Sequence, residues 1–520
     1  MTVDALLATT SSLLASSAIA LLLVYFFKTA RSTGMDVDLD GTIIRFHVDA
    51  MSIALTDLYY GGKGDYSGLI AVQDLLSQRI FQESEPSAKR DAVDIDRALR
   101  EASQLDWNTA LASGRFVLGL EPGYVDLVRL AFRLFGLRIA SIFKLYCAML
   151  GLSSALLAMA FWQTPGLLWS LGAFMLAFHF VVFGTGILDF QARSITNKRL
   201  AAILAVLPAL HIMLIMATGQ EATAFQIALA AAQGLMFAWV LWMRNSTGWL
   251  VMAALALALA LLGLGLAVDT AFLRGLWAFA LLMGLSELMT AHRHAKVHPI
   301  HHSRDLSMAY PKWHSAYVGF AEDAATFAKN LLPFQKPQLL DLNACIAVVR
   351  VLRTSPAFAQ DGLASQVIGL RPPFISFNLS AFFGMKWTVY ERAAKIAFFE
   401  YFWKNLSTMP KLYFYLKPRS LVRNLGLVMA PLPAYLKAHP LLALSFLLTA
   451  LPAGYHFAQA PSVAQAIGFA AFFLLMGAPI PLLWAFSFRP AGYSMAEIAW
   501  MLLFALWTTI ACLTALALPI

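Results

Sequence analysis

The chain has 520 residues, of which 60% are hydrophobic and 13% are charged, and its formal net charge is +9. The charged fraction is about half that of an ordinary soluble domain, and the mean hydropathy of +0.68 excludes that class. The three cysteines have neither disulfide nor metal spacing and carry no information on the redox compartment. No basic run with interleaved aromatic residues indicates a nucleic-acid groove, so the positive charge favours anionic lipid headgroups or lipid phosphates as partners.

Apolar runs of about 20 residues, the length that crosses a bilayer as a helix, recur along the chain. Backbone groups in lipid must be hydrogen-bonded within their own segment, and the runs lack the alternation of barrel strands. We therefore expect an all-α polytopic membrane protein with about ten transmembrane helices. The predicted spans are 5–27, 139–162, 166–188, 199–218, 223–243, 248–268, 271–290, 439–457, 463–486 and 497–518. The first run lacks the basic start and short core of a signal peptide, so we expect it to be retained.

Two long polar loops flank the six central spans, and an even number of spans puts both loops on the same face of the membrane. We expect the loops to be interfacial and to complete any site together. The predicted division of the chain is a first transmembrane helix at 1–27, a first loop at 28–138, a six-helix core at 139–290, a second loop at 291–438 and C-terminal helices at 439–520.

The first loop contains segments with helical periodicity. Asp91–Ala112 has the spacing of an amphipathic helix. Tyr124–Leu137 sets Arg129 and Arg133 one turn apart beside a Leu/Phe face, which is typical of a helix lying in the headgroup plane. The glycine-rich stretch 61–64 lacks the spacing of a phosphate-binding P-loop and is interpreted as a flexible turn.

The second loop ends in Tyr390–Arg423, where aromatic residues alternate with lysines and arginine. Aromatic side chains and long cations are typical of the membrane–water interface, so this part of the loop is expected to lie on the bilayer. Segment 421–436, interrupted by prolines, is too short for a span and is interpreted as re-entrant or interfacial.

Three carboxylates, Asp36, Asp38 and Asp40, follow the end of the first predicted span by about ten residues. Carboxylates just outside the lipid can act as a general base or hold a divalent metal ion against a phosphate leaving group. In an extended segment, alternation turns all three to one side. The alternative is a solvated acidic turn without a catalytic role.

A histidine-rich segment opens the second loop, and His298, His301 and His302 have the form of a metal-binding box. The chain lacks the further boxes that a di-iron oxidation site needs, although that chemistry remains an alternative. The other two interpretations of this segment are a site for a single metal ion and a basic stretch that contacts lipid headgroups. If a lipid-linked substrate is handled, these histidines should meet Asp36–Asp40 in a groove that opens sideways to lipid.

Ionisable residues inside or at the ends of predicted spans are further candidates, because burying them in lipid is costly: His179, Asp189, His211 and Glu287. Each can line a site or form a satisfied pair. The basic side chains Arg193, Lys198 and Arg199 can bind a lipid phosphate, since arginine offers two parallel donors; alternatively they are only a topology signal.

The order of one span, a long loop, six spans, a second loop and closing spans resembles the GT-C glycosyltransferases. The resemblance implies a catalytic carboxylate soon after the first span, a polyprenyl-phosphate sugar as donor, and a site completed by the loop after the seventh span. The acidic run Asp36–Asp40 is the local match. Stretches 127–156, 311–320 and 410–423 also look similar to uncharacterised polytopic bacterial proteins of envelope-polysaccharide assembly.

The membrane face that the resemblance implies for the long loops conflicts with the distribution of basic residues. GT-C loops lie on the outer or lumenal face, whereas basic residues in the short loops favour a cytoplasmic position for both long loops. The face of the long loops therefore stays open, in a membrane that we expect to be the bacterial inner membrane. Besides lipid-linked sugar transfer, the alternatives are a non-catalytic subunit of an envelope-assembly or secretion complex with membrane-protein partners, and a transporter.

Overall fold

The computed structural model describes residues 3–29, 35–36, 41–82, 89–90, 92–117, 122–162, 164–180, 204–243, 270–296, 312–332, 335–336, 340–358, 370–371, 374–375 and 387–458. The chain divides into two compact units, each described by itself. The first unit comprises Met1–Val297, Val428–Ala478 and Trp500–Ile520. The second unit comprises His298–Leu427 and Pro479–Ala499.

The described residues are mostly helical, and three helices are long and apolar enough to cross a membrane: α7 (Ile139–Ala160), α12 (Ala224–Met243) and α14 (Thr270–His294). The pair α24 (Leu432–Ala438) and α25 (Pro440–Ala458) passes the same test together but is bent by 104°. The helical fold class is therefore confirmed. The number of about ten spans and the arrangement of the loops stay predictions, because several predicted spans lie wholly or partly outside the described residues.

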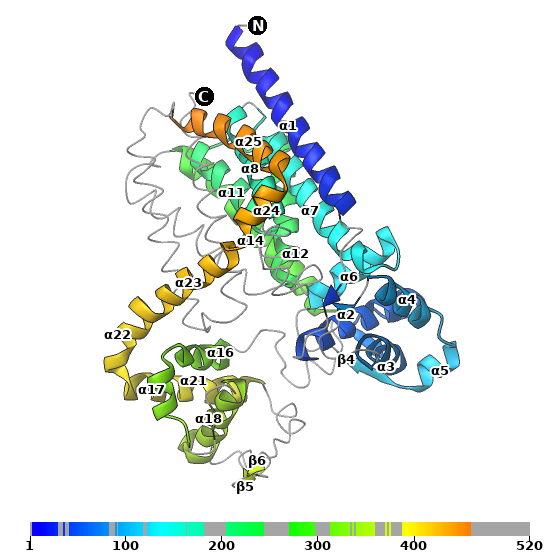
Figure 1. The fold of residues 1–520 in the computed structure, drawn as a ribbon, viewed down its shortest axis with the longest axis vertical. Helices are drawn as coiled ribbons and strands as arrows, with labels where there is room; N and C mark the ends of the chain where they lie inside the picture. Colours follow the sequence, from blue (N-terminus) through cyan, green and yellow to red (C-terminus); the bar gives the residue numbers. More distant parts are fainter. Residues whose placement is uncertain are drawn as a thin grey trace. The chain divides into compact units, whose positions relative to one another are not determined.

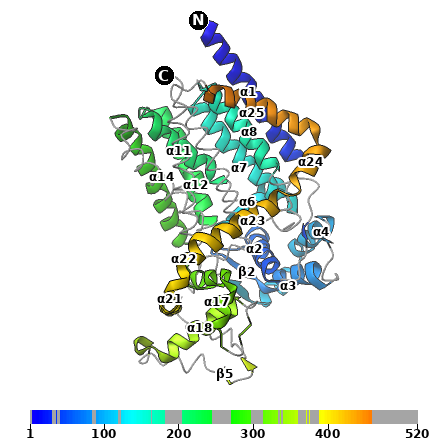
Figure 2. The same cartoon turned by 60° about the vertical axis from the view of Figure 1, so that its left-hand side comes forward.

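Further apolar helices of the first unit are α1 (Val3–Thr29), α8 (Pro165–His179) and α11 (Val206–Thr218). Helix α8 packs against α1 and α25, while α14 packs against α12 and α11 (Figures 1 and 2). Between α7 and α12, the buried Ser153 hydroxyl donates to Gln233 Oε1 at 2.8 Å, and Gln233 Nε2 donates to the Ser153 carbonyl at 2.8 Å. Two polar groups thus satisfy each other inside an apolar bundle, where an unpaired one would be costly.

The first loop forms short helices and strands: β1 (Met35–Asp36), α2 (Gly41–Tyr59), β2 (Ser67–Leu69), α3 (Ile70–Ser77), a π-helical turn (Gln78–Gln82), β3 (Lys89–Arg90), α4 (Ala92–Ser103), α5 (Trp107–Ala112), β4 (Arg115–Val117) and α6 (Pro122–Phe135). Strands β1 and β3 pair antiparallel, as do β2 and β4. The single helix expected over Asp91–Ala112 is two helices. The side chain of Asp106 accepts a hydrogen bond from the Thr109 N–H at 3.0 Å and so starts a new helix.

Helix α6 is the element that joins the first loop to the bundle. It packs against α2, α7 and α12, with Tyr124–Val128 buried. The predicted helix is present, but this part of it contacts protein rather than headgroups. A side chain at Gly123 would force the neighbouring backbone to shift, because a Cβ there would lie 2.5 Å from the backbone of Trp242 and Met243. This close approach fixes α6 against the carboxyl end of α12.

The second unit has its own aromatic core. Its elements are α16 (Lys312–Val318), a 3-10 turn (Gly319–Glu322), α17 (Ala324–Lys329), α18 (Leu340–Thr354), a turn at Pro356–Phe358, β5 (Leu370–Arg371), β6 (Phe374–Ile375), α21 (Trp387–Lys404), a turn at Leu406–Thr408, α22 (Met409–Lys411), a π-helical turn (Leu412–Leu416) and α23 (Lys417–Met429). Strands β5 and β6 pair antiparallel. The ring of Phe320 stacks on Tyr401 at 4.3 Å and on Phe398 at 4.8 Å between ring centroids. Segment 421–436 forms the end of α23 and most of α24.

Candidate functional site

The turn after α2 places a carboxylate against a backbone amide. Gly61 and Gly64 have φ of +61° and +66°, a conformation that glycine adopts without strain. The Gly64 N–H therefore points back to Asp57 and donates to its Oδ1 at 3.0 Å. The stretch interpreted as a flexible turn is thus an ordered turn that holds a buried acid.

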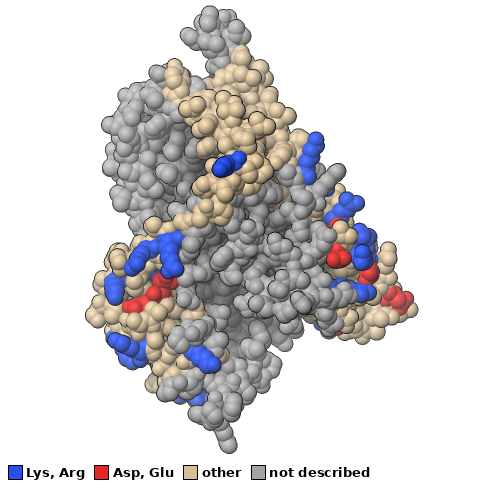
Figure 3. All heavy atoms as spheres, in the orientation of Figure 1, with Lys and Arg blue, Asp and Glu red and all other residues tan. Residues whose placement is uncertain are grey.

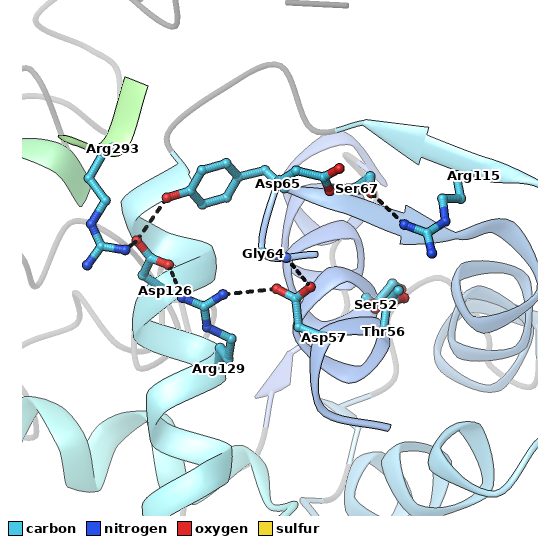
Figure 4. A network of polar contacts seen from close by, with 11 residues as sticks. Ser52, Thr56, Asp57, Gly64, Asp65, Ser67, Arg115, Asp126, Arg129 and Arg293 are labelled. Atoms are coloured by element: carbon cyan, nitrogen blue, oxygen red, sulfur yellow. Dashed lines mark hydrogen bonds and ion pairs between the residues drawn. The ribbon is translucent and has the colours of Figure 1, made fainter. Parts of the chain in front are cut away.

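Helix α6 supplies the partner of this acid. Asp126 and Arg129 lie three residues apart on α6, on one side of the helix. Arg129 Nη2 contacts Asp126 Oδ1 at 2.6 Å, and Arg129 Nη1 contacts Asp57 Oδ2 at 3.0 Å (Figure 4). One guanidinium therefore bridges two carboxylates from different helices.

The end of α14 closes the network. Arg293 Nη1 lies 2.8 Å from Asp126 Oδ2, and the Tyr66 hydroxyl donates to the same oxygen at 3.1 Å (Figure 4). Tyr66 adopts a φ of +62°, which is unusual for a residue with a side chain, and its ring is buried. The Asp126 carboxylate is thus held from α6, α14 and the turn before β2.

Burial and ion pairing oppose each other at these acids. Burial raises the pKa of Asp57, while the Gly64 amide and Arg129 act in the opposite direction. Burial likewise raises the pKa of Asp126, against the effects of Arg293, Arg129 and the Tyr66 hydroxyl. With their oxygens occupied by donors, both carboxylates are suited to positioning neighbouring groups rather than to taking a proton from a substrate.

A pocket of about 660 Å³ opens beside this network. It is lined by Asp57, Leu58, Gly62, Lys63, Gly64, Asp126, Arg129, Leu130, Arg133, Trp239, Arg293 and Lys296. Five basic side chains face two acidic ones, so the lining carries an excess of positive charge. Lys63, Arg133 and Lys296 are exposed, and none of them forms an ion pair with an acidic residue in the described part of the chain.

The pocket lies where polar and apolar parts of the first unit meet. Trp239 and Arg293 come from α12 and α14, near the carboxyl ends of two helices that are long enough to span a membrane. The remaining lining residues come from the first loop and from Lys296, just after α14. An anionic group at the end of a lipid chain would meet donors here. The arrangement is suited to binding phosphate.

Of the predicted catalytic, phosphate-binding and metal-binding residues, Asp36 alone lies within the described part of the chain. Asp36 lies in β1, opposite Lys89. Asp38, Asp40, His298, His301, His302, Arg193, Lys198 and Arg199 lie outside the described residues, as does Asp189. The predicted groove between the aspartates and the histidines therefore stays a prediction. Among the described residues, no group of three His, Cys, Asp or Glu side chains is placed to hold a metal ion.

The remaining ionisable candidates have separate environments. Glu287 is exposed on α14. His211 is fully buried on α11, its ring 5.6 Å from that of Phe161, and neither of its ring nitrogens has a hydrogen-bond partner in the described structure. A further histidine of the second loop, His314, lies in the second unit, with Nδ1 2.6 Å from the Tyr390 hydroxyl.

Asp57, Asp126 and Arg293 were not predicted from the sequence as site residues. Two signals pointed toward them. Asp126 precedes Arg129 by three residues on a segment recognised as helical, a spacing that favours an ion pair. Arg293 sits at the end of a predicted span, where a cation must find water or an acid. Comparisons with models of protein families, with characterised proteins and with solved structures found no match to this chain.

Proposed function

We propose that this chain is an integral membrane protein that binds a polyprenyl-phosphate sugar through its phosphate in the basic pocket and transfers the sugar, as GT-C glycosyltransferases do. The observation that carries the proposal is the excess of basic side chains in a pocket lined by the ends of two candidate spans and by the first loop. A lipid-linked phosphate needs such a place, with apolar helices for its chain and cations for its head.

The pocket residues divide by their partners. Arg129 and Arg293 are engaged by Asp57 and Asp126 at 2.6–3.0 Å, and these four side chains balance one another. Lys63, Arg133 and Lys296 provide the charge that is left for a ligand. Cations that line such a pocket would stabilise the negative charge that develops on a departing phosphate.

The general base is proposed to come from Asp36, Asp38 or Asp40. The GT-C resemblance implies a carboxylate in this part of the chain, and both Asp57 and Asp126 are already occupied by arginine donors. The base would take the proton of the acceptor hydroxyl as the hydroxyl oxygen attacks the anomeric carbon of the sugar. The polyprenyl phosphate would leave with the electrons of the broken bond. A divalent metal ion held by these carboxylates would assist the leaving phosphate.

Binding is tested with the full chain in lipid nanodiscs, with polyprenyl phosphate as the probe. The triple variant Lys63→Gln, Arg133→Gln and Lys296→Gln should bind it at least about tenfold more weakly, because each lost charge-assisted contact contributes roughly 1 kcal/mol or more. The matched control removes three exposed cations that do not line the pocket: Arg100, Lys329 and Arg353. Equal affinity of the two triple variants would exclude the pocket as the phosphate site.

Transfer is tested separately by following the release of polyprenyl phosphate from a panel of polyprenyl-phosphate sugars. Asp36→Asn, Asp38→Asn and Asp40→Asn together should abolish release and leave binding intact. Full activity of this triple variant would reject the assigned base. In that case a different carboxylate would have to act as the general base.

Orientation gives an independent test, because GT-C enzymes place their long loops outside the cytoplasm. Arg100 is exposed on α4 of the first loop. Arg100→Cys, in a chain whose three native cysteines are replaced by alanine, should react with a membrane-impermeant maleimide on intact cells. Reaction only after the cells are opened would contradict the glycosyltransferase proposal.

A further inference from the structure

The end of the second unit divides its aromatic side chains between the inside and the outside. Tyr401 and Tyr413 are buried and belong to the aromatic core. Trp403, Phe414 and Tyr415 point the other way and are 63%, 83% and 54% exposed. Packing within the unit accounts for the first set only. The second set leaves more than half of each side chain exposed, although the Trp403 ring contacts that of Phe402 within the unit.

Further exposed residues of the same segment add apolar area and positive charge. Leu406 and Val422 are exposed, as are Lys404, Lys411, Arg419 and Arg423. We call these six residues, with Trp403, Phe414 and Tyr415, the aromatic–basic surface. Residues 403–423 contain no acidic side chain. Lys and Arg side chains gather over α22 and α23 in the space-filling view (Figure 3).

One contact shows how ring and cation are arranged. The Arg419 guanidinium carbon lies 5.8 Å from the centre of the Tyr415 ring, and Arg419 Nη1 donates to the Tyr415 hydroxyl at 3.3 Å. The polar tip of the tyrosine and the cation thus lie together, while the ring body stays exposed. This pairing suits a boundary between apolar chains and charged headgroups.

We propose that the aromatic–basic surface inserts its rings into the headgroup region of a bilayer that contains anionic lipid. Charge complementarity favours such a lipid, because the four charged residues of the surface are all basic. Position along the chain selects a bilayer over a soluble protein partner. Helix α23 ends at Met429, and α24 and α25, the bent pair that passes the test for a span, begin at Leu432. The inference rests on the proposed membrane location but not on sugar transfer.

The test uses the full chain in nanodiscs, with the native cysteines replaced by alanine and one spin label at a time. The test site is Phe414→Cys. The site Arg353→Cys, exposed on α18 of the same unit, serves as a water reference. The site Leu235→Cys, exposed on the candidate span α12, serves as a lipid reference. Collisions of each label with dissolved oxygen and with a water-soluble nickel complex report its depth.

In nanodiscs that contain phosphatidylglycerol, the label at position 414 should collide with nickel severalfold less often than the label at 353, and with oxygen more often. In pure phosphatidylcholine it should move toward the water reference, because the electrostatic attraction is lost. Lys404→Gln, Lys411→Gln, Arg419→Gln and Arg423→Gln together should have the same effect in anionic lipid.

Each of the other outcomes would overturn one part of the proposal. A water-exposed label at 414 beside a lipid-exposed label at 235 rejects the surface as a bilayer contact and points to a protein partner. Water exposure at both positions rejects the membrane location itself, and with it the proposed function. Equal depth at 414 in both lipids rejects the role of the cations.

Discussion

Replacing Arg129 with methionine is expected to destabilise the first unit, because this side chain bridges Asp57 and Asp126. Two unit charges about 4 Å apart attract by roughly 4 kcal/mol at an effective dielectric constant near 20. The Arg129 side chain is 29% exposed, so solvent screening and desolvation offset much of this attraction. Because Arg293 still contacts Asp126, we expect a loss of about 3 kcal/mol, at the lower end for a broken buried pair.

The loss is measured by equilibrium unfolding with SDS in mixed micelles. The control is Arg97→Met, which removes an exposed arginine that lies 3.8 Å from Asp94 and should cost less than about 0.5 kcal/mol. Adding Asp57→Asn to Arg129→Met should recover about 1–2 kcal/mol, since the stranded charge is removed as well. The reasoning is refuted if Arg129→Met costs no more than the control, or if the two changes at 57 and 129 are additive.

The pH dependence of the same variant follows from the sign of the shift. Arg129 lowers the pKa of Asp57 against the raising effect of burial, so removing the arginine raises the pKa further. A carboxyl whose folded-state pKa lies above its unfolded value stabilises the fold most at low pH and loses that stabilisation as pH rises. The deficit of Arg129→Met should therefore be smaller at pH near 5 than at neutrality. A deficit that is constant or grows on acidification contradicts this assignment.

Two further predictions concern packing and a buried lysine. Gly123→Ala should cost about 2 kcal/mol and lower the melting temperature, because its Cβ would meet the backbone of Trp242, whereas Gly284→Ala, with open space, should not. Burial lowers the pKa of Lys417 to about 7, so the stability of the second unit should rise between about pH 7 and pH 10. Lys417→Met should remove this rise in the free energy of unfolding. The rise is at most several kcal/mol, at about 1.4 kcal/mol per unit of pKa shift. A melting temperature of Gly123→Ala equal to that of Gly284→Ala, or an unchanged pH slope, would contradict the respective argument.

The helices were predictable because their apolar runs have about the length that a membrane-spanning helix needs. The span predicted at 139–162 is α7 at Ile139–Ala160, and the one predicted at 223–243 is α12 at Ala224–Met243. The first loop was less predictable, since its elements are short and its breaks depend on single side chains. The cap at Asp106, which divides the helix expected over Asp91–Ala112, is the clearest case.

The site was less predictable than the helices for a physical reason. The candidate residues predicted from the sequence are clusters of neighbouring ionisable side chains, Asp36–Asp40 and His298–His302. The network of the structure joins single residues from distant segments, Asp57, Asp126 and Arg293, and such contacts exist only after packing. The turn at Gly64 illustrates this further. Its positive φ and its amide bond to Asp57 cannot be read from a glycine-rich stretch.

The helix ends that line the pocket refine its charge and, with it, the expected ligand. The carboxyl ends of α12 and α14 each contribute about half a negative charge through the helix dipole. Five basic and two acidic side chains therefore leave a net charge of about +2 rather than +3.

A sugar linked through a phosphodiester carries about one negative charge, whereas the released polyprenyl phosphate carries about −1.5 to −2 at neutral pH. If the chain transfers sugar as proposed, the pocket would match the leaving group better than the donor, as differential stabilisation of a developing charge requires. We expect polyprenyl phosphate to bind severalfold more tightly than its sugar-linked form at pH 7.5. This preference should shrink near pH 5, where the monoester is protonated to a monoanion. Equal affinities at both pH values would mean that the pocket recognises the phosphate without favouring its release.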